Sequence, residues 1–369
     1  MRNIIVIASL VIGLIFIFLF KSFAQKIEYP AFDQIESIDT IVQPFLANDY
    51  SKALSIGVLK DGKMKFYNFG KHSDDRPDLP TQQNIYEIGS ITKTFTASVL
   101  VQMVEEGLVQ LDDPISKYLP EGVVNLEGDK IITLQDLSSH HSGLPRLASN
   151  FFATVTDMNN PYTNYKEKDL YDFLKTFKGV SKEKREVAYS NVGVDLLGHI
   201  LSLVAEQSYE EMITERIFQP LEMNNSTITF GEKHLEQLIK GHNPSGKITA
   251  NWDFPHFGGA GAIRSTTEDM LQYLNAQLQN KTFTKAHEVR LPMGETSKIG
   301  LGWITTPSKN TNENIIWHNG GTGGYRSFAG FIKEHNLGVV VLNNTTLSVD
   351  EIGILVLDYL VKEKTKAEK

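Results

Sequence analysis

The chain contains no cysteine among its 369 residues. This absence excludes disulfide bonds, catalysis by a thiolate, iron–sulfur clusters held by cysteine and lipid attachment through an N-terminal cysteine. The fold must therefore rely on its hydrophobic core rather than on covalent cross-links. A chain of this length is long enough for one large domain or for two domains that share a core.

Positive charge is also in short supply. The chain has 36 lysines and arginines against 44 aspartates and glutamates, which gives a net charge of −8. We therefore expect no nucleic-acid partner. The zinc motif His-Glu-x-x-His is absent, and the adjacent pair His140-His141 would point in different directions on most backbones. We expect neither a metal nor a cofactor.

Only the N-terminus carries a long hydrophobic run. A basic start, Met1-Arg2-Asn3, precedes the uncharged segment Ile4–Phe20 and the small residues around Ala24. We interpret residues 1–24 as a secretory signal that is cleaved after Ala24, which predicts an exported protein, periplasmic or secreted. The alternative is an uncleaved membrane anchor, because 17 residues exceed the usual signal core of about 7 to 15 and fall just short of the ~20 that span a bilayer. Membrane contact is expected only through this segment.

Strand patterns occur near both ends of the chain. Asp61-Gly62 stands between two apolar runs and predicts a β-hairpin, and the segments Ile315–His318, Arg326–Ile332 and Gly338–Asn343 are typical of strands. Helical periodicity dominates from about residue 116 to 290. We predict an α+β fold with an antiparallel sheet built from both chain ends, flanking helices and a mostly helical inserted domain.

This pattern predicts three parts after the N-terminal segment. Residues 25–115 and 290–361 form the sheet domain, residues 116–289 form the helical domain, and residues 362–369 form a solvated, charged tail.

The segment that begins at Gly89-Ser90 is the strongest candidate for chemistry. Apolar residues recur from there at helical intervals until Gly107, which predicts a buried helix. Ser90 and Lys93 lie one turn apart on the same face, with their Cβ atoms about 5 to 6 Å apart. The free N–H groups of a helix start favour negative charge, so a hydroxyl beside an amine at this place indicates acyl transfer. A second Ser-x-x-Lys, at Ser181, lies in a highly charged stretch that we expect to be a solvated loop.

Two further motifs recur, and their context selects one copy of each. Tyr-x-Asn occurs at Tyr162, Tyr189 and Tyr273. Only Tyr189-Ser190-Asn191 stands between an apolar pair and the start of a helical pattern. Tyr273 lies inside a helical run and is expected to serve packing, whereas Tyr162 lies in a turn-like stretch without an apolar frame.

His-x-Gly occurs at His141, His256 and His318. Only His318-Asn319-Gly320 lies on a strand pattern. We expect the loop that contains His141 to be structural, and the glycine-rich stretch after His256 to line the far side of the site.

With these three motifs in order, the chain resembles the serine β-lactamase, DD-peptidase and related esterase family, on its class C side. The resemblance covers nearly all of residues 45 to 360, and Gly300-Leu301-Gly302-Trp303 adds to it. The chain departs from the β-lactamase pattern at His318, where lysine is usual. Histidine at this place is seen in DD-peptidases, esterases and aminopeptidases of the family, which argues against efficient β-lactam turnover.

The resemblance implies that Ser90 forms an acyl-enzyme and that Lys93, Tyr189 or both in relay accept its proton. The sequence leaves this choice open. It also implies an oxyanion hole formed by the N–H groups of Ser90 and Gly321. Asn191 would hold a substrate amide, and His318 would place a carboxylate or the tyrosine. The expected catalytic residues are Ser90, Lys93 and Tyr189, and the expected substrate-binding residues are Asn191, His318, Gly320 and Gly321.

The sequence thus predicts a serine hydrolase that acts on a small-molecule or peptide substrate with a carbonyl centre. A β-lactam or a D-Ala-D-Ala-type peptide, such as a cell-wall peptide, is our first choice. The alternatives are a carboxylesterase or D-aminopeptidase of the same family. A different class is a penicillin-binding sensor that is acylated without turnover. Each motif alone also has a plain structural reading, in which Ser90 is a helix cap, Lys93 a surface residue and His318 an ordinary strand histidine.

Overall fold

The computed structural model describes residues 27–367. The predicted signal or anchor, residues 1–24, lies outside this range. Within residues 27–367 no helix combines the length and the apolar character that a membrane crossing requires.

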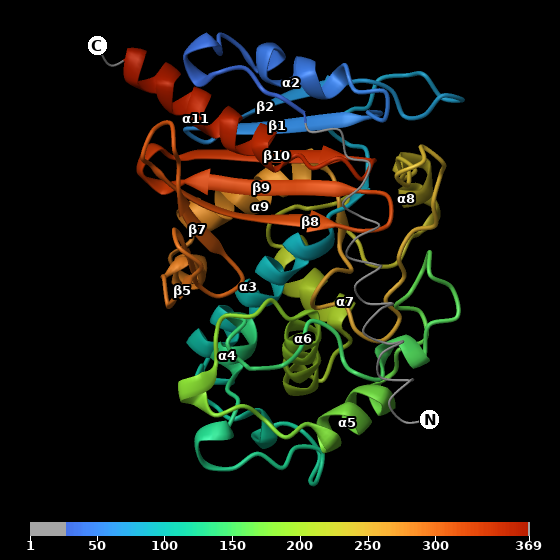
Figure 1. Cartoon of the computed structure of the whole chain (residues 1–369), viewed down its shortest axis with the longest axis vertical. Coiled ribbons are helices and arrows are strands. Elements are labelled where there is room, and N and C mark those ends of the chain that lie inside the picture. Colours follow the sequence, from blue (N-terminus) through green and yellow to red (C-terminus); the bar gives the residue numbers. More distant parts are fainter. Residues whose placement is uncertain (1–26, 368–369) are drawn as a thin grey trace, which may run out of the picture.

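An antiparallel sheet of eight strands forms one half of the molecule (Figure 1). Its order is β2-β1-β10-β9-β8-β7-β6-β5. Strand β1 pairs with β10, with Leu54 opposite Asn343, so the two ends of the chain meet in one sheet. This confirms the predicted antiparallel α+β architecture. The strands are β1 (Leu54–Lys60), β2 (Lys63–Phe69), β5 (Leu291–Met293), β6 (Ser297–Ile299), β7 (Ile304–Pro307), β8 (Asn314–Gly321), β9 (Arg326–Ile332) and β10 (Leu337–Asn343). A separate ribbon pairs β3 (Tyr86–Glu87) with β4 (Arg264–Ser265).

The predicted hairpin is present between β1 and β2. Asp61 and Gly62 both have positive φ angles, 49° and 77°, which is the conformation that a tight two-residue turn requires. The strands β5, β6 and β7 were not predicted, because three or four residues are too few to show an alternating pattern.

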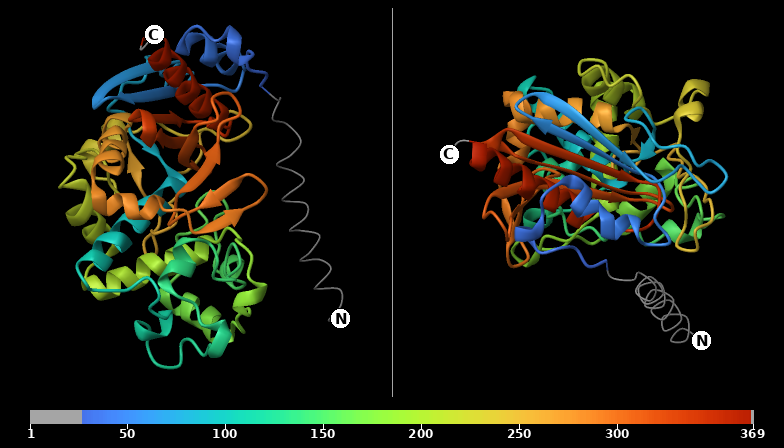
Figure 2. Two further views of the ribbon diagram at one scale, coloured as in Figure 1. Left: turned by 90° about the vertical axis from the view of Figure 1, so that its left-hand side faces the viewer. Right: turned by 90° about the horizontal axis from the view of Figure 1, so that it is seen from above.

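Helices cover both faces of the sheet (Figure 2). They are α2 (Ile38–Leu46), α3 (Thr92–Glu105), α4 (Leu134–Ser138), α5 (Glu167–Thr176), α6 (Asn191–Ala205), α7 (Tyr209–Ile213), α8 (Glu232–Gln237), α9 (Thr267–Gln279), α10 (Lys281–Thr284) and α11 (Asp350–Ala367). Short 3₁₀ turns lie at Phe32–Gln34, Gly89–Ile91, Ile115–Lys117, Gly128–Lys130, Phe151–Ala153, Lys182–Lys184, Lys285–His287 and Lys333–His335, and one π turn lies at Thr214–Phe218.

The sheet separates two hydrophobic clusters. Helices α2 and α11 pack on one face and bury the smaller cluster, which includes Phe45, Phe328 and Val356. The larger cluster lies on the other face and continues into the helical half, where α3 packs against α6. Helix α9 lies directly on β1 and β10. Residues 267–279, which we assigned to the helical domain, therefore pack against the sheet.

Two local predictions about helix ends were wrong. Helix α11 continues to Ala367, so most of the predicted solvated tail, residues 362–369, is helical. Its lysines and glutamates are good helix formers, so the run of charged residues does not indicate the end of the helix. The three-residue step from Ser265 to Glu268 in the sequence predicts a capping arrangement at the start of helix α9. The helix is instead capped by the side chain of Thr266, which accepts a hydrogen bond from the N–H of Asp269.

Candidate active site

Ser90 lies on the 3₁₀ turn Gly89–Ile91 that leads directly into α3. Helix α3 runs through the larger core, and every residue from Thr92 to Val101 is buried. Lys93 is only 1% exposed, and its Nζ atom donates hydrogen bonds to Ser90 Oγ at 3.1 Å and to the carbonyl oxygen of Ala260 at 2.6 Å. Among the described residues no carboxylate forms an ion pair with it. The amine therefore lies within hydrogen-bond reach of the hydroxyl, which is the geometry that an activated nucleophile requires.

Strand β8 lies against the turn that carries Ser90. A Cβ atom on Gly89, whose φ is +51°, would lie 2.7 Å from the nitrogen of Gly321. A Cβ atom on Gly320 would lie 1.9 Å from the carbonyl oxygen of Ile88. Side chains are sterically excluded at both places, so the two backbones can approach each other. Ser90 and Gly321, whose N–H groups are the predicted oxyanion donors, thus belong to segments in direct contact.

Tyr189 reaches the same place from the start of α6. Ser190 caps this helix by accepting a hydrogen bond from the N–H of Gly193 at 2.9 Å. The centroid of the Tyr189 ring lies 4.9 Å from Nζ of Lys93 and 5.0 Å from the guanidinium carbon of Arg146. The Tyr189 ring is therefore close to both the Lys93 amine and the Arg146 guanidinium, and it lines the same hollow as Ser90.

The loop from His140 to Pro145 holds the Tyr189 motif in place. The N–H of Ala188 donates to the carbonyl of His140 at 2.8 Å, and the hydroxyl of Ser190 donates to the carbonyl of Pro145 at 2.7 Å. The N–H of Asn191 donates to the next carbonyl, that of Arg146, at 2.9 Å. This loop has the structural task that we expected for it.

His318 lies on β8 close to Tyr189, and the centroids of the two rings are 6.1 Å apart. Its Nδ1 atom lies 2.6 Å from the carbonyl oxygen of Asn319 and must carry a proton to donate there. Burial and then the charge of Lys93 lower the pKa of His318 to about 3, so the ring is neutral. Its Nε2 atom has no hydrogen-bond partner among the described residues. A neutral ring with a free acceptor is better suited to orient the phenol or the amine than to attract a carboxylate.

The neutral state of His318 has a consequence for stability. Its pKa is about 3 in the folded protein, whereas an unperturbed histidine has about 6.5, so between these values the unfolded chain binds more protons. Stability is therefore complete above pH 6.5 and falls as the pH falls below it, by about 1.4 kcal/mol per pH unit for this group. We expect wild-type protein to lose about 2 kcal/mol more unfolding free energy than His318→Gln between pH 7 and pH 5. Urea unfolding at the two pH values measures this difference. The exposed His256 supplies the control His256→Gln, which should follow the wild type, and parallel losses in wild type and His318→Gln would contradict the prediction.

Ser90 opens into two adjoining hollows of about 210 and 760 Å³. Their linings share Ser90, Arg146, Leu147, Tyr162, Trp252, Gly321 and Thr322, and Tyr189, Asn319 and Gly320 line the larger hollow. The only charged side chains in either lining are Arg146 and Arg326. Arg326 donates through Nη1 to the carbonyls of Thr322 and Tyr325, while Arg146 is exposed and forms no ion pair with a described residue. This cavity is electropositive in a protein whose net charge is −8.

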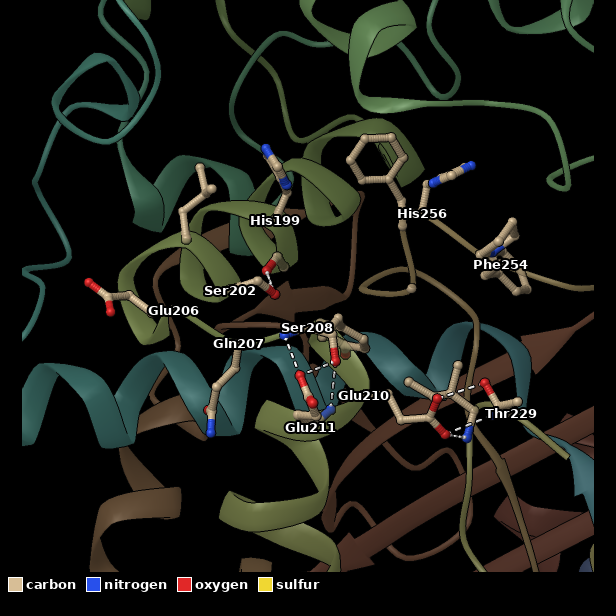
Figure 3. A pocket seen from close by; sticks show the side chains of 17 residues that line it. His199, Ser202, Glu206, Gln207, Ser208, Glu210, Glu211, Thr229, Phe254 and His256 are labelled. Atoms are coloured by element: carbon tan, nitrogen blue, oxygen red, sulfur yellow. Dashed lines mark hydrogen bonds between the residues drawn. The ribbon is translucent and has the colours of Figure 1, made fainter. Parts of the chain in front are cut away.

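A second cavity, of about 630 Å³, lies beside the C-terminal half of α6 and contains none of the predicted site residues (Figure 3). Two of its three glutamates are hydrogen-bonded to the protein itself. Glu210 accepts hydrogen bonds from the N–H groups of Ile228 and Thr229, and Glu211 caps α7 through Ser208. We therefore place the candidate active site at Ser90 and not in this second cavity.

The structure also shows what happens at the rejected motif copies. Ser181 lies in an exposed segment and donates to Asp129, as expected for a solvated loop. Tyr273 is fully buried and stacks on Phe95, as expected for packing. Tyr162 lies in a turn, as expected, but its ring packs among aromatic side chains and lines both hollows, and its hydroxyl lies 3.4 Å from the side-chain nitrogen of Asn191.

Comparisons with known proteins agree with the fold and with the family. A family model described as Beta-lactamase matches residues 38–357. Protein flp of Staphylococcus aureus (strain MW2) is 30% identical over 330 residues, which are 85% of this chain but only 63% of that protein. The D-alanyl-D-alanine-carboxypeptidase/endopeptidase AmpH of Escherichia coli (strain K12) is 27% identical over 343 residues and 86% of each chain. The solved structure of an octameric penicillin-binding protein homologue from Pyrococcus abyssi is 26% identical, with a TM-score of 0.75, over 88% of this chain and 77% of that one.

Proposed function

Because the chain belongs to the beta-lactamase family, we propose that it is a serine hydrolase in which Ser90 forms an acyl-enzyme. The family assignment confirms the resemblance stated for the sequence. The observation that carries the proposal is the hydrogen bond between buried Lys93 and half-buried Ser90, which lines an electropositive cavity. One of the relatives is named a D-alanyl-D-alanine-carboxypeptidase/endopeptidase, which supports a hydrolase.

In the proposed reaction the Oγ atom of Ser90 bonds to the carbonyl carbon while its proton passes to Lys93 or Tyr189. The negative charge that develops on the carbonyl oxygen is stabilised by the N–H groups of Ser90 and Gly321. The bond to the leaving group then breaks as that group takes up the proton. Water attacks the resulting ester, the acid product leaves, and the hydroxyl of Ser90 is restored.

Among carbonyl substrates we favour a peptide with a free C-terminal carboxylate, of the D-Ala-D-Ala type. Arg146 and Arg326 are the groups that support an anionic substrate, because no acidic side chain lines either hollow. His318 is neutral at the pH of the reaction and cannot replace a lysine as the source of positive charge. The esterase, D-aminopeptidase and non-turnover sensor readings remain alternatives. Export through residues 1–24 is part of the same proposal, since a cell-wall peptide lies outside the cytoplasm.

Two experiments test the substrate. The first compares the cleavage of two peptides that end in D-Ala-D-Ala, one with a free C-terminal carboxylate and one amidated. The second measures the intact mass of the protein after incubation with benzylpenicillin. Release of D-alanine from the free acid, at a much higher rate than cleavage of the amide, supports the proposal. A Ser90 adduct with penicillin that persists for hours agrees with a peptidase, and a transient adduct favours a β-lactamase. Cleavage of neutral esters alone, without an adduct or D-alanine release, would establish the esterase instead.

Arg146 offers a direct test of charge recognition. We expect Arg146→Gln to raise KM for the free-acid peptide about fivefold, as the loss of ~1 kcal/mol from an exposed ion pair predicts. Hydrolysis of a neutral ester should change much less. Arg76→Gln is the matched control, because Arg76 is exposed in another loop and pairs only with Asp78. Equal effects on both substrates would show that Arg146 acts through Tyr189 and not through the carboxylate.

A further inference from the structure

The carbonyl that holds Lys93 is itself fixed by an acidic side chain. Ala260 accepts the hydrogen bond from Lys93 at 2.6 Å, and its own N–H donates to the carboxylate of Asp195 at 2.9 Å. Residue 260 is thus held from both sides, by α3 and by α6. Asp195 lies one turn after Asn191 on α6, on the helix that also positions the Tyr189 motif.

The segment around Ala260 depends on such anchors for its path. It contains Gly258, Gly259 and Gly261, and a Cβ atom on Gly259 would lie 2.7 Å from the carbonyl oxygen of Val194 on α6. The carbonyl of Gly259 also accepts a hydrogen bond from Thr96 on α3. Glycines restrict the backbone little, so the direction of the Ala260 carbonyl is set by these hydrogen bonds.

The surroundings of Asp195 are unfavourable for a carboxylate. Apart from the N–H of Ala260, no described residue is hydrogen-bonded to its side chain. It faces a cavity of about 20 Å³, whose lining is mostly apolar and aromatic: Leu147, Ala148, Phe151, Tyr162, Tyr165, Leu170, Val192 and Phe257. An acidic group in such surroundings lowers stability unless a nearby cation compensates for it.

We propose that Asp195 is a positioning residue for Lys93: it fixes the Ala260 carbonyl that orients the amine, and its negative charge sets the protonation of that amine. The proposal requires only a reactive Ser90, so it stands apart from the choice of substrate. It assigns to Asp195 no contact with the substrate.

Four titratable groups face Asp195. They are Lys93 from α3, Tyr162 and Tyr165 from the segment before α5, and Tyr209 from α7. Burial raises the pKa of each of the three phenols, so they stay neutral between pH 5 and 9. Burial likewise raises the pKa of Asp195 to about 6, against the opposing effects of the Ala260 N–H and of Lys93. Asp195 is therefore charged at pH 8 and neutral at pH 5.

The test compares wild type, Asp195→Asn and Asp195→Ala in the rate of Ser90 acylation by a fluorophosphonate from pH 5 to pH 9. Asparagine keeps an acceptor for the N–H of Ala260 and removes the charge. We expect the Asp195→Asn and wild-type rates to converge near pH 5, where both side chains are neutral, and to differ at least threefold at pH 8. A faster variant identifies the neutral amine as the reactive form of Lys93, and a slower one identifies the cation. The acylation rate of Asp195→Ala should be at least tenfold below that of the wild type at every pH, because the N–H of Ala260 loses the hydrogen bond that fixes the Ala260 carbonyl.

Asp269→Asn is the matched control. Asp269 is a buried aspartate whose pKa, like that of Asp195, is raised to about 6 by burial, and it accepts a hydrogen bond from the N–H of Asn225, but it is not hydrogen-bonded to any part of the site. Its variant should keep the wild-type pH profile. Thermal unfolding verifies that each variant is folded. A rate ratio of Asp195→Asn to wild type that does not change with pH would overturn the proposal and leave Asp195 a purely structural residue. If wild-type Ser90 did not react with the fluorophosphonate, the catalytic assignment itself would be overturned.

Discussion

The Ser90→Ala variant is expected to lose at least about 10⁴-fold in kcat, because removal of a nucleophile in comparable serine enzymes abolishes the covalent route and leaves only the effect of binding and of the oxyanion donors. No adduct with penicillin or fluorophosphonate should form. The fold should be kept, since Ser90 makes one side-chain hydrogen bond, to Lys93, and alanine fits the same turn. Hydrolysis of a peptide or an ester, followed with purified protein, measures the loss.

Ser181→Ala is the matched control for this experiment. Ser181 begins the only other Ser-x-x-Lys of the chain, and its hydroxyl contacts Asp129 in an exposed segment. This variant should retain wild-type rates. Full activity in Ser90→Ala, or an equal loss in both variants, would contradict the assignment of the nucleophile.

The residues that could be predicted are those whose position follows from local rules. Ser90 and Lys93 share a helix, where a three-residue step fixes the distance between two side chains. Tyr189 and His318 lie at a loop-to-helix junction and on a strand, and both contexts are visible in the hydrophobic pattern. The structure brings all four together: Ser90 and Tyr189 line one cavity, and Lys93 and His318 are buried next to them.

The remaining parts of the site depend on tertiary contacts that leave no local pattern. The partner of Lys93 is the backbone carbonyl of Ala260, and any residue type supplies a carbonyl. Arg146 and Tyr162 come from irregular segments, whose paths periodicity does not determine. Asp195 occupies one position of a regular helical run, so only its acidic character could have singled it out.

Lys93 and Tyr189 provide the second large expected effect, because one or both must take the proton from Ser90. We expect Lys93→Met to lower kcat/KM by about 10²- to 10⁴-fold, the usual contribution of a general base. Methionine has a similar length but carries no charge, so the carbonyl of Ala260 loses its hydrogen bond from Lys93 and Asp195 loses a nearby cation. The unfolding free energy should therefore fall, and the rates are compared at a temperature at which urea unfolding shows that the variant is folded.

Tyr189→Phe is expected to lower kcat/KM by a similar factor, and the double variant decides how the two groups act. If they pass one proton in relay, the double variant should be little worse than either single variant, because groups that act as a unit are not additive. If they act independently, the two losses should multiply. Tyr273→Phe is the control, since Tyr273 belongs to the other Tyr-x-Asn motif that lies in the core, where its hydroxyl contacts Ser98 and Thr94. That variant should lose stability and keep its rates. Near-normal rates in both single variants at Lys93 and Tyr189 would mean that another group accepts the proton, and His318, with its free Nε2, would be the next to test.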